Sequence, residues 1–159
     1  MAVLYLGYYY AYPDGSAPAR VLAAAVWAQA QASAWLIHRF DPSVATSDVV
    51  GGTEIRGAHY AVAVVKDCAS FDAQALLVAS VLAFPVSWRK RVLGVGLGVS
   101  FMALANTLRI ASLYFIGAYM PTHFDMIHEE IMPLVLVLVA TSFFALWVQS
   151  LRASKTVAA

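Results

Sequence analysis

The chain has 159 residues, of which 62% are hydrophobic, and its mean hydropathy is +0.73. Soluble domains are about 45–50% apolar, so this composition indicates an integral membrane protein. The formal net charge is +1 and the charges fall in short clusters, which gives no support to a nucleic-acid-binding surface. The one cysteine, Cys68, excludes an internal disulfide and is an inert thiol, an intermolecular partner or a reactive group.

Four stretches reach the length of about 20 mostly apolar residues that a membrane-spanning helix needs. They cover approximately residues 19–37, 69–88, 92–112 and 131–149. The first is alanine-rich and contains Gln29 and Gln31, so we expect it to pack against the other helices. Residues 1–12 are too short to span and are interpreted as an interfacial aromatic segment or the remnant of a longer span, with "PDGSAP" as the following turn.

These stretches predict an all-α polytopic membrane protein with a single integral membrane domain over residues 1–159. Its bundle has about four transmembrane helices, with one more if the N-terminal segment belongs to a span. Lys and Arg accumulate in cytoplasmic loops, and "WRKR" (88–91) is the clearest basic loop. With this loop in the cytoplasm, segments 38–67 and 120–130 face the extracytoplasmic side.

Segment 38–67 has the sequence pattern of strands. Its β-branched and aromatic runs are interrupted at Gly51-Gly52 and Gly57. We predict a small extracytoplasmic β-hairpin that leads into Cys68 and presents the cysteine or an edge for a substrate. Candidate substrate-reading residues on it are Arg56, His59 and Tyr60.

Arg109 is the only Lys or Arg within the four predicted spans. A charged residue at mid-bilayer costs about 2.5 kcal/mol or more, which favours a functional role. Near the outer boundary, where the predicted span places Arg109, snorkelling is the alternative. Asn106, the only asparagine in the chain, lies three residues earlier and thus on the same helical face, which favours a polar site inside the bundle.

The predicted outer loop, "MPTHFDMIHEEIMP", contains two histidines and three carboxylates. Thr122 can cap a helix with Asp125 as its capping-box partner, and Asp125 can then orient His128 at i+3. A solvated acidic helix start is the plain alternative. A metal site is a further alternative, although a spacing of five turns His123 and His128 about 140° apart on a helix.

The predicted topology brings Cys68, Arg109 and His128 to one membrane face. A thiol, an imidazole and a fixed cation suit cysteine-dependent acyl transfer, in which the thiolate attacks a carbonyl, histidine exchanges protons and the guanidinium stabilises the oxyanion. Arg109 near Cys68 would also favour the thiolate.

Three motifs make the region of about residues 49–149 resemble the exosortase/archaeosortase family of membrane cysteine transpeptidases. They are "VAVVKDCAS" at the start of a span, "NTLRI" (106–110) within the next span, and "FDMIHEE" before the last. The resemblance, closest to compact bacterial exosortases, implies that Cys68, Arg109 and His128 are catalytic, with Asn106, Asp125 and His123 in support. The family usually shows C-S-G or C-N-G at the nucleophile, whereas this chain reads Cys68-Ala69-Ser70.

The resemblance further implies an enzyme of the inner or cytoplasmic membrane, multi-pass, with its active site on the extracytoplasmic face. Its substrates would be secreted proteins with a C-terminal sorting signal, a recognition motif like that of PEP-CTERM proteins followed by a transmembrane helix and a basic tail. The acyl group would pass from Cys68 to a lipid or lipid-linked envelope acceptor. No metal, other cofactor or nucleic-acid partner is expected.

Two alternatives remain open at the level of the sequence. One is a metal-dependent membrane hydrolase that uses the "HFDMIHEE" loop, and it would be indifferent to loss of Cys68. The other is a non-enzymatic transporter or assembly subunit, in which Asn106 and Arg109 form a polar contact between helices.

Overall fold

The computed structural model describes residues 16–156, which form a helical protein with one small antiparallel sheet. The predicted aromatic segment 1–12 lies outside the described residues, as does most of the "PDGSAP" turn. The helices are α2 (Ala17–His38), α3 (Phe71–Ala83), α4 (Trp88–Tyr119), α5 (Phe124–Met126) and α6 (Met132–Thr156). The strands are β1 (Ala45–Val49), β2 (Gly52–Arg56) and β3 (Ala61–Val65). Three short helical turns complete the fold, namely η1 (Lys66–Ala69), η2 (Pro121–His123) and the π-helical η3 (Ile127–Ile131).

Two helical stretches in the described part of the chain are long and apolar enough to cross a membrane. They are Trp88–Tyr119 and Pro121–Arg152, and they contain the predicted spans 92–112 and 131–149. α2 matches the predicted stretch 19–37 in position but does not meet the same test. α3 has 13 residues, about 20 Å at 1.5 Å per residue, which is less than the hydrocarbon core of about 30 Å. The presence of membrane-length helices is therefore shown, and the total number of spans stays a prediction.

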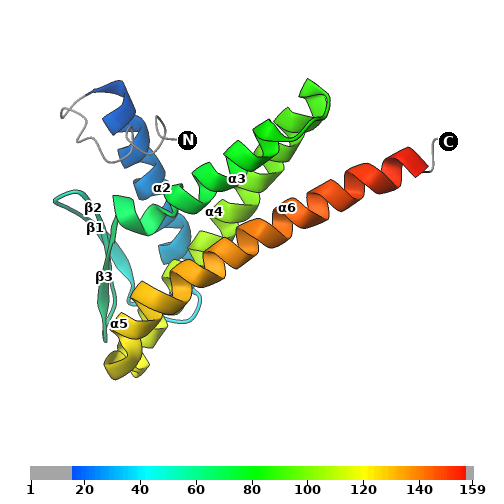
Figure 1. The fold of residues 1–159 in the computed structure, drawn as a ribbon. Coiled ribbons are helices and arrows are strands. Elements are labelled where there is room, and N and C mark those ends of the chain that lie inside the picture. Colours follow the sequence, from blue (N-terminus) through cyan, green and yellow to red (C-terminus); the bar gives the residue numbers. More distant parts are fainter. Residues whose placement is uncertain (1–15, 157–159) are drawn as a thin grey trace.

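The predicted second stretch, 69–88, is shorter in the structure because of Pro85. Phe84 ends α3 in an extended conformation, which is the conformation that a following proline favours. After this turn α4 begins at Trp88. α3 then packs against both α4 and α6, as Figure 1 shows.

The predicted hairpin is in fact a three-stranded sheet in the order β1-β2-β3. Both strand pairs are antiparallel, with Val49 opposite Gly52 in the first and Arg56 opposite Ala61 in the second. Gly51 forms the first turn with φ +79, a conformation that glycine adopts at little cost. β2 and β3 form a hairpin that leads into Cys68, and the sheet has one strand more than predicted. Residues 45–49 also form a strand, although their side chains are mostly exposed and lack an apolar alternation.

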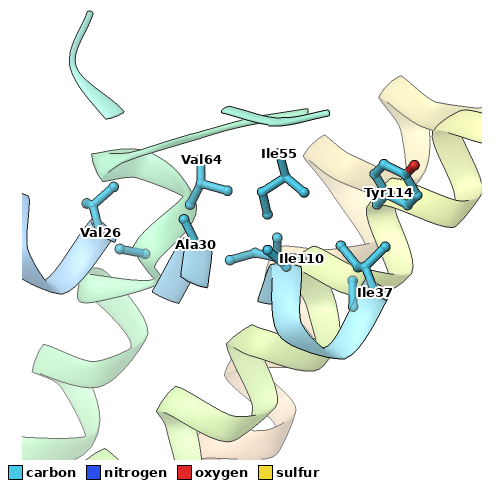
Figure 2. Packing of buried hydrophobic residues seen from close by; sticks show 10 residues of the cluster. Val26, Ala30, Ile37, Ile55, Val64, Ile110 and Tyr114 are labelled. Atoms are coloured by element: carbon cyan, nitrogen blue, oxygen red, sulfur yellow. The ribbon is translucent and has the colours of Figure 1, made fainter. Parts of the chain in front are cut away.

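The core beside the sheet is formed by α2, α4 and one face of the strands (Figure 2). Ile55 of β2 and Val64 of β3 point from the sheet toward these helices and are 0% and 1% exposed. Ile37 of α2 and Ile110 of α4 meet them there. This packing fixes the sheet against the middle and C-terminal half of α4.

A second core cluster joins α3, α4 and α6. Gly94 of α4 faces the ring of Trp147, and Gly98 faces Leu77 and Phe143. Small residues at such contacts let membrane helices approach closely. The turn between α3 and α4 and the end of α6 lie at the opposite end of the protein from the sheet and α5 (Figure 1). The basic loop 88–91 is thus separated from the sheet, while the compartment that each end faces stays a prediction.

Candidate functional site

Cys68 lies in η1, the four-residue turn that joins the end of β3 to the start of α3. The residue is half-buried and its thiol is free. The sulfur donates a weak hydrogen bond to the main-chain oxygen of Ala63, at 3.9 Å. The side chain packs against the edge of the core between the sheet, α2 and α4, and its sulfur lies toward β3.

Asn106 occupies the centre of the site and is 0% exposed. Its Nδ2 donates to the main-chain oxygen of Cys68 at 2.8 Å and to Oε1 of Gln29 at 3.3 Å. Its Oδ1 accepts a hydrogen bond from the hydroxyl of Ser70. One buried amide thus ties α4 to the cysteine turn, to α2 and to the first residue before α3.

Arg109 lies beside Asn106, as their spacing of three predicted, and is 8% exposed. Its Nη1 donates at 3.4 Å to the main-chain oxygen of Cys68 and at 3.4 Å to Oδ1 of Asn106. Nε is the one buried side-chain polar atom in the described residues that has no hydrogen-bond partner. The side chain that contacts the main chain of Cys68 therefore also contains a buried donor without a partner.

The position of Arg109 argues against snorkelling. The predicted span placed it near the outer boundary, but α4 continues ten residues further, to Tyr119. Those residues correspond to about 15 Å of helix. The side chain is turned inward to the cysteine turn, so its burial has a local cause in the bundle.

Ser70 was not predicted as a site residue. In the described part of the chain it is the one residue other than glycine with a positive φ, at 56°. It also occupies the position at which the family that the chain resembles usually carries glycine. Glycine adopts this left-handed conformation freely, whereas other residues pay about 1–2 kcal/mol for it. The hydrogen bond from the Ser70 hydroxyl to Asn106 offsets part of that cost, so the glycine-like backbone is kept without glycine.

Gln29 is the second residue that the sequence analysis did not assign to the site. It was expected to pack against other helices, and its Oε1 accepts hydrogen bonds from Asn106 and from Thr107 of α4. Its Nε2 donates to the main-chain oxygen of Ala103. A glutamine in an apolar, alanine-rich helix was the available signal, but the sequence could not say which helix it would meet.

His128 lies in η3 and is held by aromatic contacts. Its ring stacks on Phe124 with centroids 5.5 Å apart, and Phe124 packs against Tyr60 at 5.8 Å. Tyr60 lies just before β3, about 10 Å along the chain from Ala63, whose main-chain oxygen accepts the hydrogen bond from Cys68. Among the described residues no hydrogen bond joins His128 to Cys68 or Arg109. The structure therefore brings Cys68, Asn106 and Arg109 together, and places His128 on a neighbouring aromatic column.

The predicted capping box at Thr122 is not formed. Thr122 lies inside η2, where its hydroxyl is 3.1 Å from Nδ1 of His123, and α5 begins without a side-chain cap. Asp125 is exposed, and within the described region no hydrogen bond joins it to His128. The helical stretch begins at Pro121, so Thr122 lies within its first turn and not at the cap position that the pattern required. Within residues 16–156, no three His, Cys, Asp or Glu side chains are grouped so that they could hold a metal ion.

A separate polar contact lies where α2 and α4 end. Tyr114 donates to Oδ2 of Asp41 at 2.6 Å, beside a cavity of about 150 Å³. The Asp41 carboxylate also accepts a hydrogen bond from the main-chain N–H of Ser43 at 3.1 Å. Hydrogen bonds from the Ser43 side chain and from Tyr114 lower the pKa of Asp41 below its usual value. This contact anchors the segment that links α2 to the sheet.

Comparison with known proteins agrees with the motifs around this site. The family model described as transmembrane exosortase matches residues 1–146, which includes Cys68, Asn106, Arg109 and His128. No curated protein and no solved structure matches the chain at a significant level. Membership rests on a match that covers nearly the whole chain, and the long apolar helices agree with it. This membrane protein belongs to the transmembrane exosortase family.

Proposed function

We propose that this protein is a membrane cysteine transpeptidase that cleaves the C-terminal sorting signals of secreted proteins. In this proposal Cys68 is the nucleophile, Arg109 stabilises the oxyanion and His128 exchanges protons. The membrane is the inner or cytoplasmic one, and the site faces the extracytoplasmic side. The substrate carries a PEP-CTERM-like signal, and an envelope lipid or lipid-linked group accepts the acyl chain.

The observation that carries the proposal is the shared anchoring of the cysteine turn by two buried polar residues. Asn106 and Arg109 both donate to the main-chain oxygen of Cys68, at 2.8 and 3.4 Å. Nε of Arg109 is a buried hydrogen-bond donor without a partner. A buried donor that stays unsatisfied destabilises the fold, so a group that accepts its hydrogen bond would bind favourably. A developing oxyanion is a group that would use it, and such preorganised donors are worth most where water is excluded.

The proposed reaction has two acyl-transfer steps. The Cys68 sulfur attacks the carbonyl carbon of the scissile peptide bond, and the thiol proton passes to His128. The tetrahedral oxyanion forms opposite Arg109 and collapses as the C–N bond breaks, with His128 giving its proton to the leaving amine. A thioester on Cys68 remains. The acceptor nucleophile then attacks the thioester, loses its proton to His128, and leaves as the acylated product while that proton restores the thiol.

The role of His128 requires a change on substrate binding. Catalytic hydrogen bonds are often long or incomplete before the substrate is bound. The aromatic column of Tyr60, Phe124 and His128 joins the turn before β3 to η3, so the imidazole is linked to the strand that leads into Cys68. The proposal needs the imidazole to reach the thiol directly or through one water.

The metal-dependent alternative has no observation in its favour in the described residues, because His123, His128 and the loop carboxylates do not form a ligand group. The non-enzymatic alternative explains the contact between Asn106 and Arg109 as helix packing. It does not explain why both residues converge on the main-chain oxygen of the single cysteine.

The test is to incubate the purified protein in nanodiscs with a panel of sorting-signal peptides and to measure intact mass with and without hydroxylamine. A hydroxylamine-sensitive adduct on the wild-type protein that is absent from Cys68→Ala supports an acyl-enzyme. Arg109→Ala and His128→Ala should each leave the signal uncleaved while the protein stays folded. Normal processing by Cys68→Ala would exclude the cysteine mechanism.

A further inference from the structure

The strand that leads into Cys68 is an edge strand with an open side. The sheet order β1-β2-β3 leaves one side of β3 without a partner strand. Gly57 N–H donates to Tyr60 O at 2.9 Å across the turn between β2 and β3. Hydrogen-bonded and non-hydrogen-bonded pairs alternate in an antiparallel ladder. The main-chain groups of Ala61, Ala63 and Val65 therefore point away from β2, toward the open edge.

The thiol lies on this same edge. The main-chain oxygen of Ala63, one of the outward-facing groups, accepts the hydrogen bond from Cys68. Val65 is the N-cap of η1, so its carbonyl accepts the first hydrogen bond of that turn. In the described part of the chain, no further hydrogen bond reaches the outward-facing main-chain groups of Ala61 and Ala63. The nucleophile thus lies against the row of backbone groups that an added strand would use.

The two edges of the sheet differ in how they are protected. Natural sheets guard their edges with charged residues, because an open edge pairs with other chains. The β1 edge carries Asp48 and polar neighbours. β3, "AVAVV", has no charged or polar side chain, and Ala63 in its middle is exposed. The unguarded edge is the one beside the thiol.

We propose that the substrate polypeptide binds as an extended strand along the open edge of β3, upstream of its scissile bond. This inference rests on the proposed function and names how its substrate is held. Peptide recognition by strand addition obtains affinity from main-chain hydrogen bonds and thus tolerates varied side chains. A substrate N–H that bonds to the Ala63 oxygen also displaces the Cys68 thiol from it, so binding frees the nucleophile for attack.

The first test removes one outward-facing donor from β3. Proline lacks an N–H and is tolerated on edge strands where that group faces outward, so Ala63→Pro keeps the ladder with β2. We expect its kcat/KM for thioester formation to fall at least tenfold. Alkylation of Cys68 by N-ethylmaleimide should stay within twofold of wild type, which shows an intact nucleophile. Asp48→Pro, at an outward-facing position of the β1 edge, is the matched control and should react within twofold of wild type.

The second test alters the substrate backbone. Replacing one peptide bond at a time by an ester removes one N–H, and a net hydrogen bond is worth about 0.5–1.5 kcal/mol. For a paired strand, esters at every second position should lower kcat/KM about three- to tenfold, and esters between them should have little effect. Equal effects at all positions, or an Ala63→Pro protein as fast as wild type, would overturn strand addition.

A binding measurement separates this inference from the proposed function. In Cys68→Ala protein, the peptide should slow hydrogen exchange at the amides of Ala61, Ala63 and Val65. If these amides are protected but wild type forms no thioester, strand addition stands and the transpeptidase proposal fails. If they are not protected, strand addition fails whatever the catalytic result. Dimerisation that Ala63→Pro abolishes without affecting turnover would instead assign the edge to a second copy of the chain.

Discussion

The side chain of Asn106 donates a hydrogen bond of 2.8 Å to the main-chain oxygen of Cys68, 38 residues earlier in the chain. A buried amide in the middle of α4 thereby fixes the turn that carries the nucleophile. The same amide accepts hydrogen bonds from the Ser70 hydroxyl and from Arg109, and it donates one to Gln29. Several testable consequences depend on this network and on the aromatic contacts beside it.

Replacing Asn106 by alanine should impair both stability and catalysis. The change leaves the Ser70 hydroxyl without its buried partner, which costs about 1–3 kcal/mol of the free energy of unfolding, whereas Gln29 Oε1 keeps the hydrogen bond from Thr107. We expect thioester formation to slow at least tenfold because the Cys68 turn loses its shortest anchor. Denaturant titration in detergent and intact-mass kinetics check the two effects. A fully active Asn106→Ala protein would show that Arg109 alone positions the turn.

Arg109 should not be replaceable by lysine. A guanidinium offers several donors in a fixed plane, so it can hold the Cys68 oxygen and still offer Nε, whereas an ammonium is a single compact charge. Loss of an oxyanion donor slows an acyl transfer about 10²–10³-fold. We expect Arg109→Ala to show a loss of this size and Arg109→Lys to recover little of it. Wild-type rates in the lysine variant would mean that only the positive charge matters.

Ser70 offers a test of backbone conformation. Ser70→Gly loses the hydrogen bond to Asn106 but relieves the left-handed strain, so its stability should stay within about 1 kcal/mol of wild type. Ser70→Ala loses the hydrogen bond and keeps the strain, and should be about 1–2 kcal/mol less stable. Thermal unfolding of the two variants in the same detergent gives the comparison. The reverse order would refute the role assigned to the positive φ.

The aromatic column can be displaced through Gly117. A side chain at this glycine would collide with the ring of Tyr60, and overpacking of this kind costs about 1–3 kcal/mol. We expect Gly117→Ala to destabilise the protein and to slow processing, because Tyr60 carries Phe124 and His128 with it.

Gly96 in the same helix supplies the control for that variant. A Cβ at Gly96 meets nothing within 4 Å, so Gly96→Ala should gain about 0.5–1 kcal/mol from helix propensity and keep its activity. The free energy of unfolding and the turnover rate of Gly96→Ala and Gly117→Ala are measured under the same conditions and compared. Equal effects of the two substitutions would point to α4 as a whole and not to the contact with Tyr60.

The contact between Asp41 and Tyr114 predicts sensitivity to acid. Hydrogen bonds from Ser43 and Tyr114 hold the pKa of Asp41 below its usual value of 3.8. A carboxylate with a depressed folded-state pKa adds stability above the unfolded-state pKa, and this stability is lost as the pH falls through the folded-state pKa. Asp41→Asn should therefore be less stable than wild type at pH 7, with a difference that shrinks below pH 3.8.

Tyr114→Phe separates the two causes of that pKa shift. It removes the hydroxyl donor and leaves the Ser43 contact, so the stability difference between Asp and Asn at position 41 should become smaller at pH 7. Melting temperatures of the four proteins at pH 7 and pH 3 complete the cycle. A difference that does not change with pH would contradict the assignment to the ionised carboxylate.

Part of this site could be predicted from the sequence because it depends on local rules. Asn106 and Arg109 are rare polar residues three positions apart in an apolar stretch, so a shared helical face follows from helix geometry alone. The order of motifs around Cys68, Arg109 and His128 also indicated the family that the comparison supports. Local patterns misled at Thr122, because the capping box placed Thr122 before the helix, whereas the helical stretch already begins at Pro121.

The sequence by itself determined the class of protein and the residues with chemical potential, since hydrophobic content, helix period and the scarcity of polar groups are properties of the chain. Tertiary structure decided which of them meet. It placed Gln29 and Ser70 on Asn106, turned Arg109 inward beside Cys68, and set His128 on the Tyr60 column. These contacts join residues from separate helices and strands, and their geometry arises only when the burial of Ile55 and Val64 against α2 and α4 fixes the sheet on the bundle.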